Sequence, residues 1–214
     1  VPLPYGPSSG SEGLKKNVDL IAGVRDSVGD NFDIMIDCYM ALSVEYVIQL
    51  VKALIPYNIR WFEEPLIPDD YKGYSELKRR LPETIISTGE HEYTRYGFSQ
   101  LIDCGVDILQ PDMMWCGGMT EARRITNMAA TQDIPVIPHG SGVYAFHHQV
   151  SFPNTPFAEF LMLSPEGDIA TPQFGSLFKD EPLPINGKLV LSNAPGFGIE
   201  LNKKDLKFIR PFEL

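Results

Sequence analysis

Short apolar segments alternate along the chain with longer segments whose apolar residues recur about every three to four positions. We predict strands at 34–37, 59–63, 85–88, 106–110, 134–137 and, with a weaker pattern, 157–160. Their first residues lie 21 to 28 positions apart, which is the length of one strand and one crossover helix. The pattern predicts an α/β fold with a parallel sheet covered by helices.

The longer segments have the periodicity of amphipathic helices. One face stays apolar over 14–28, over 44–55 and over 122–129. Ser43 and Thr120 stand where a helix N-cap is expected, because a side-chain oxygen there can accept a hydrogen bond from the first turn.

An open doubly wound sheet and a closed barrel share this alternation. Neither a Gly-x-Gly-x-x-Gly nor a Gly-Lys-Ser/Thr loop occurs, which disfavours nucleotide-binding versions. We count about six strand–helix units, whereas a (β/α)8 barrel of the TIM type has eight. If the fold is such a barrel, the chain is short by about two units.

The pattern changes after residue 163, where proline and glycine become frequent. Residues 184–191 read as a hairpin that turns at Asn186-Gly187. We therefore divide the chain into a partial barrel, 1–163, and a C-terminal tail, 164–214.

Composition narrows the functional classes. The 214 residues carry a formal net charge of −10, which argues against partners such as nucleic acids or anionic membranes. There is no apolar stretch long enough to span a bilayer, and the first residues lack the features of a signal peptide. The three cysteines are too few for a disulfide framework, so we expect a reducing, cytoplasmic location.

Acidic residues follow three successive predicted strands. Asp37 and Glu63 end the first two strands, and Glu90 comes shortly after the third. Because the carboxyl ends of parallel strands open into one mouth, these carboxylates should converge there. They would repel one another without a cation, and hard oxygen ligands in an open site favour Mg²⁺. Glu64 should point to the other face by strand alternation and is interpreted as a structural acid.

The next predicted strand ends bring a candidate acid–base pair. Asp112 follows the fourth strand and His139 the fifth, so the carboxylate could orient the ring as a general base. Glu159 could donate a hydrogen bond to an oxyanion if protonated, or it is simply a buried or surface acid. His91 could contact a substrate or cap its loop, and His147 and His148 read as core or surface residues.

Five ordered segments resemble the barrel domain of the enolase superfamily, mandelate racemase subgroup. They are residues 35–40, 61–65, 88–93, 110–112 and 138–142. The resemblance implies a carbon–oxygen lyase that dehydrates a small sugar acid with Mg²⁺, giving a 2-keto-3-deoxy product.

The same resemblance implies a role for most of the candidate residues. Asp37, Glu63 and Glu90 would bind the metal, and His139, oriented by Asp112, would remove the α-proton. Glu159 would hydrogen-bond the enediolate from the side opposite the metal. His91 is assigned to substrate binding from its position after Glu90 alone. The resemblance also implies a homo-oligomer, a tail packed on an α+β capping domain, and a site that needs this N-terminal region to be complete. The chain would then be the C-terminal part of a longer protein, and by itself an incomplete barrel with exposed strand edges.

Three alternatives stay open from the sequence. The substrate could be another acid sugar, or the reaction a racemisation or epimerisation that uses a second base. The chain could also be a non-catalytic remnant that serves as an interaction module.

Overall fold

Parallel strands form the inner layer of the protein and follow one another in chain order. In the computed structural model, which describes residues 1–140 and 142–204, they form a four-stranded sheet ordered β1-β2-β3-β4. The strands are β1 (Ile34–Asp37), β2 (Ile59–Glu63), β3 (Ile86–Thr88) and β4 (Ile108–Leu109).

Two further chain segments extend this sheet at its edges. Pro2 forms a parallel bridge with Asp37 at the β1 edge, and Val136 forms one with Leu109 at the β4 edge. Residues 1–3 and 134–137 therefore extend the parallel sheet at its two edges, each through one bridge. The place predicted for the strand at 134–137 is confirmed.

The strand predicted at 157–160 is wrong, because these residues form no ladder in the structure. Val136 donates instead to the carbonyl of Asn154, and Pro156 has no N–H to pair. Phe157 stacks on Trp61 of β2 at 5.9 Å between ring centroids, so an aromatic contact takes the place of the ladder.

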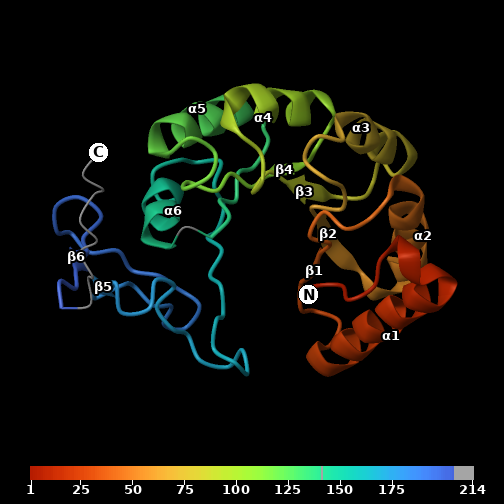
Figure 1. Ribbon diagram of the computed structural model, residues 1–214, viewed down its shortest axis with the longest axis horizontal. Helices are drawn as coiled ribbons and strands as arrows, with labels where there is room; N and C mark the ends of the chain where they lie inside the picture. The colour runs from red at the N-terminus through yellow and green to blue at the C-terminus, as the bar shows by residue number, and fades with distance from the viewer. Residues whose placement is uncertain (141, 205–214) are drawn as a thin grey trace, which may run out of the picture.

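Helices form an outer arc around the strands (Figure 1). They are α1 (Gly10–Val28), α2 (Val44–Leu54), α3 (Tyr71–Arg80), α4 (Thr94–Asp103), α5 (Met119–Ala130) and α6 (Gly142–Gln149), with 3₁₀ turns η1 (Pro7–Ser9) and η2 (Ile55–Tyr57). The arc does not close. The fold is thus a partial (β/α) barrel, as the sequence predicts.

The predicted helix starts are half right. Ser43 accepts from the amide of Tyr46 at 3.4 Å and caps α2. Thr120 lies inside α5, because Gly118, with a φ of 83°, already turns the chain into the helix. Both helices bury their apolar face in one continuous core against the strands.

The region after α6 contains little regular structure. β5 (Phe178–Lys179) and β6 (Glu200–Leu201) pair antiparallel. The predicted hairpin is present: Ile185 and Lys188 exchange backbone hydrogen bonds, and Asn186 and Gly187 both have a positive φ, as a tight two-residue turn requires. The boundary at 163 stays a prediction, and Ser141 and the tail beyond 204 lie outside the described residues. No described helix is long and apolar enough to cross a membrane.

Arg25 ties the first helix to the loops at the amino ends of β1 and β2. The residue is buried, and its guanidinium donates to the carbonyls of Gly29, Phe32, Tyr57 and Asn58. A single buried cation therefore donates to four carbonyls that belong to two separate connections.

We predict that Arg25→Met lowers the free energy of unfolding by about 2–3 kcal/mol, because those carbonyls lose a charged donor. Urea denaturation measures the change. Arg79→Met is the control: its pair with Glu76 is exposed and screened by solvent, so its loss should change the stability little. Equal losses in the two variants would contradict this account of Arg25.

Candidate active site

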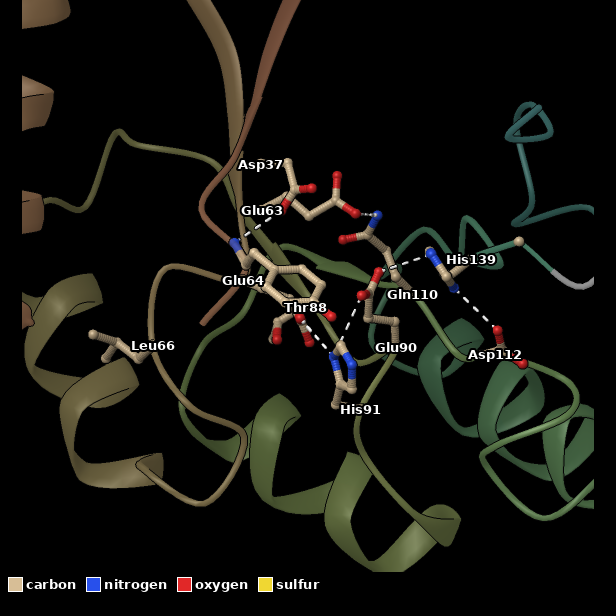
Figure 2. A network of polar contacts seen from close by, with 12 residues as sticks. Asp37, Glu63, Glu64, Leu66, Thr88, Glu90, His91, Gln110, Asp112 and His139 are labelled. Carbon is tan, nitrogen blue, oxygen red and sulfur yellow. Dashed lines mark hydrogen bonds and ion pairs between the residues drawn. The ribbon is translucent and has the colours of Figure 1, made fainter. Parts of the chain in front are cut away.

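The pairing of β1 with β2 brings the first two acids side by side. Asp37 is in register with Glu63, and both are the last residues of their strands. Glu63 is in turn in register with Ser87 of β3, three positions before Glu90. The three acids predicted from the sequence thus follow adjacent parallel strands at the same edge (Figure 2).

Gly89 sets the position of Glu90. Its φ is 131°, and a side-chain carbon there would lie 2.6 Å from the Phe98 ring and 3.2 Å from the backbone nitrogen of Gln110. Only glycine accommodates both the backbone angle and this close approach. Because Gly89 has no side chain, the segment that follows β3 can pass close to Phe98 of α4 and to Gln110 after β4, and it directs Glu90 into the site.

Burial and crowding disfavour the charged form of these acids. Burial raises the pKa of Glu63 to about 7, and the charges of Glu159, Asp37 and Glu90 add to the effect. The amide of Gln110 donates to Glu63 Oε1 at 2.9 Å and acts against this rise. Burial likewise raises the pKa of Glu90 to about 7. Closely spaced oxygen donors that are costly to ionise fit a divalent cation, which would favour their charged forms.

The predicted acid–base pair is in contact. His139 Nδ1 lies 3.0 Å from Asp112 Oδ2, and its Nε2 lies 3.1 Å from Glu90 Oε2. Burial opposes a charge on the ring, but the hydrogen bond to Asp112 and the charges of Glu159 and Glu90 raise the pKa of His139 to about 9. The ring is therefore held at both nitrogens by carboxylates.

Glu159 reaches the site without belonging to a strand. Its Oε2 accepts from the amide of Gly140, next to His139, at 2.7 Å. Its charge contributes to the raised pKa of both Glu63 and His139. The side chain thus lies beside the cluster that the sequence predicts, although the segment that carries it is irregular.

Glu64 does not point away from the site, and that prediction is wrong. Its φ of 39° breaks the alternation expected of a strand. The buried side chain places Oε2 at 2.8 Å from His91 Nδ1, which also lies 3.3 Å from Glu90 Oε1. Sequence reasoning did not assign Glu64 or Gln110 to the site. The only signal for them was their position in the sequence, since Glu64 follows Glu63 and Gln110 stands two residues before Asp112.

Glu90 also belongs to a second set of side chains that could hold a metal ion, and this set differs from the predicted ligands Asp37, Glu63 and Glu90. Among residues 1–140 and 142–204, the three side chains whose ligand atoms lie within 4.8 Å of one another are Glu64, Glu90 and His91. Figure 2 shows Glu90 between His91 and His139, with Asp37 and Glu63 beside each other above it.

The other two histidines lie outside this cluster. His148 is buried in α6 with Nε2 at 2.7 Å from Thr126 Oγ1, and burial lowers its pKa to about 4. His147 Nε2 lies 3.0 Å from the carbonyl oxygen of Phe197 in the tail. Both are packing residues, as the sequence suggests.

The family model described as "Enolase C-terminal domain-like" matches residues 7–205. The chain belongs to this family. The partial barrel therefore agrees with the resemblance found in the sequence.

Two relatives are similar over almost the whole chain. L-rhamnonate dehydratase of Saccharopolyspora erythraea is 47% identical over 213 residues, which cover 99% of this chain and 54% of that protein. The crystal structure of L-rhamnonate dehydratase from Gibberella zeae is 49% identical with a TM-score of 0.91, covering 94% of this chain and 52% of that one.

A second structure from Gibberella zeae is described as rhamnonate dehydratase complexed with Mg. It is also 49% identical, has a TM-score of 0.89, and covers 94% of this chain and 50% of that one. The chain thus spans about half the length of the relatives that it matches.

We predict that the protein in a chelating buffer becomes less stable as the pH rises from about 4.5 to 9. Folding raises the pKa of Glu63 and Glu90 from 4.5 to about 7 and of His139 from 6.5 to about 9, so the native state binds more protons in this window. The melting temperature, measured across the pH range, should fall accordingly.

The matched variants isolate the contribution of one acid. Glu63→Gln should flatten the pH dependence, whereas Glu83→Gln, at an exposed position near the opposite end of the strands, should leave it unchanged. Because His148 is present in all three proteins, its opposite effect at low pH cancels. A Glu63→Gln curve parallel to that of the unmodified protein would contradict the prediction.

Proposed function

We propose that the protein is a Mg²⁺-dependent sugar-acid dehydratase and that its substrate is L-rhamnonate. The substrate proposal is supported by the identities of 47% and 49% to L-rhamnonate dehydratases over nearly the entire chain. The geometric observation that carries the reaction is the His139 ring, held by Asp112 at one nitrogen and facing the acid cluster with the other.

Asp37, Glu63 and Glu90 would bind the metal. Their oxygen atoms suit Mg²⁺, and the raised pKa values of Glu63 and Glu90 indicate a cluster that gains from a cation. When bound, Mg²⁺ supplies positive charge that stabilises the negative charge developing on the substrate carboxylate.

His139 removes the proton from the carbon next to that carboxylate. Nε2 accepts the proton, while Asp112 holds Nδ1 and stabilises the imidazolium that forms. The bond between the third carbon and its hydroxyl then breaks, and the protonated ring can return the proton, so that the group leaves as water. The resulting enol becomes the 2-keto-3-deoxy acid.

Glu159 and His91 would contact the substrate from the rim of this cluster. Glu159, if protonated, donates a hydrogen bond to the enediolate oxygen. His91 binds a hydroxyl group of the sugar acid. The α-proton is so weakly acidic that stabilisation of the intermediate must supply most of the rate enhancement.

The assembly and location of the whole protein are also proposals. The matched relatives are about twice as long as this chain. We propose that regions corresponding to the remainder of those relatives complete the barrel and cap the site, that the protein forms a homo-oligomer, and that it acts in the cytoplasm.

The direct test is turnover of a panel of sugar acids by the full-length protein, with and without Mg²⁺. We expect a 2-keto-3-deoxy acid from L-rhamnonate, and no product after chelation. Turnover of none of the acids would refute the proposal. Exchange of the α-proton with solvent deuterium without loss of water would instead identify a racemase or epimerase.

We predict that His139→Asn lowers kcat by at least about 10³-fold, because the general base is lost. The Mg²⁺ dissociation constant, measured by calorimetry, should change less than about threefold. His147→Asn is the control, since that ring contacts the tail rather than the site, and it should retain activity. A large loss of Mg²⁺ affinity in His139→Asn would contradict the role given to His139.

A further inference from the structure

Two histidines contact Glu90, and each has a carboxylate of its own. His139 is paired with Asp112, and His91 is paired with Glu64 at 2.8 Å. Figure 2 shows the two rings on different sides of Glu90. The first pair is the proposed acid–base dyad, whereas the function above gives the Glu64 carboxylate no task.

The backbone around Glu64 fixes its side chain in place. The amide of Glu64 donates to the carbonyl of Ser87 in β3, and its own carbonyl accepts from the amide of Met40. A φ of 39° at a non-glycine residue costs roughly 1 kcal/mol or more and persists only where the surroundings impose it. The side chain is almost fully buried, with 1% of the residue exposed. Such a carboxylate cannot swing freely toward alternative partners.

The His91 ring is held on several sides. Tyr39 and Trp115 each pack edge-to-face with it at 5.8 Å between ring centroids. Nδ1 faces the carboxylates of Glu64 and Glu90. Within the described part of the chain Nε2 has no hydrogen-bond partner and is not among the buried polar atoms. Nε2 is therefore the ring nitrogen that remains for a ligand.

We propose that Glu64 is a positioning residue that holds the His91 ring through Nδ1, so that Nε2 is left to bind a hydroxyl group of the sugar acid. The nature of the ligand rests on the proposed function, but the pairing of Glu64 with His91 does not. The competing role is direct metal binding by Glu64 together with Glu90 and His91, whose ligand atoms lie close enough for one ion.

The pairing is tested first without any turnover. In the ¹⁵N spectrum of the histidine-labelled full-length protein, the His91 signal, assigned by its loss in His91→Asn, should show a proton on Nδ1. Glu64→Gln should change the Nδ1 signal, because the amide can donate as well as accept. An unprotonated Nδ1 in the unmodified protein would overturn the proposal, whether or not any sugar acid is a substrate.

Kinetics then separate positioning from metal binding. We expect Glu64→Gln to lower kcat/KM about 10- to 100-fold, as loss of a carboxylate that orients a histidine typically does. His91→Asn should lower it at least as much. The double variant should match His91→Asn alone, because Glu64 acts only through that ring. The Mg²⁺ dissociation constant of Glu64→Gln should stay within about threefold.

Glu121→Gln is the matched control. Glu121 is also a buried glutamate, but it belongs to α5 and its ion pair with Arg95 joins this helix to α4. This variant should keep kcat/KM unchanged even if it loses stability. A tenfold weaker Mg²⁺ affinity in Glu64→Gln, losses that add in the double variant, or unchanged turnover with an unchanged His91 signal would each overturn the proposal.

Discussion

The in-register parallel pairing of β1 with β2 is the constraint on which the site depends. It places Asp37 directly beside Glu63, at the end of two strands whose other residues are mostly buried. Two carboxylates at adjacent positions of a ladder repel, so the surroundings must offset a cost that the fold itself creates. Neighbouring groups offset this repulsion. The amide of Gln110 donates to Glu63, and the imidazoles of His91 and His139 lie against Glu90.

The strand-end residues could be predicted because parallel strands follow a simple rule. Once the alternation of strands and helices is established, the residue after each strand lies at one edge, and Asp37, Glu63 and Glu90 follow without knowledge of any angle. The pair of Asp112 and His139 came from the same rule. Side-chain contacts across that edge, such as the 3.0 Å between Asp112 and His139, needed only neighbouring strands.

Departures from regular backbone could not be predicted in this way. The orientation of Glu64 was wrong because its φ of 39° is a local property of the turn before Pro65, which strand periodicity does not report. The strand proposed at 157–160 failed because a ladder needs partner amides on both sides, and prolines and an aromatic stack occupy that place. Thr120 failed as a cap because Gly118, two residues earlier, already starts the helix.

The turn at Gly89 limits which substitutions the site can accept. Because a single methyl group at position 89 would meet both the Phe98 ring and the backbone nitrogen of Gln110, which follows β4, this position links the direction of Glu90 to the packing of α4. Tyr39 and Trp115 at the rim are substantially exposed, yet their rings pack against His91, and the amide of Tyr39 donates to Asp37 Oδ1. A change at position 89 would therefore act on Glu90 through buried packing, whereas a change of the Tyr39 or Trp115 side chain would act from the exposed rim on the His91 ring.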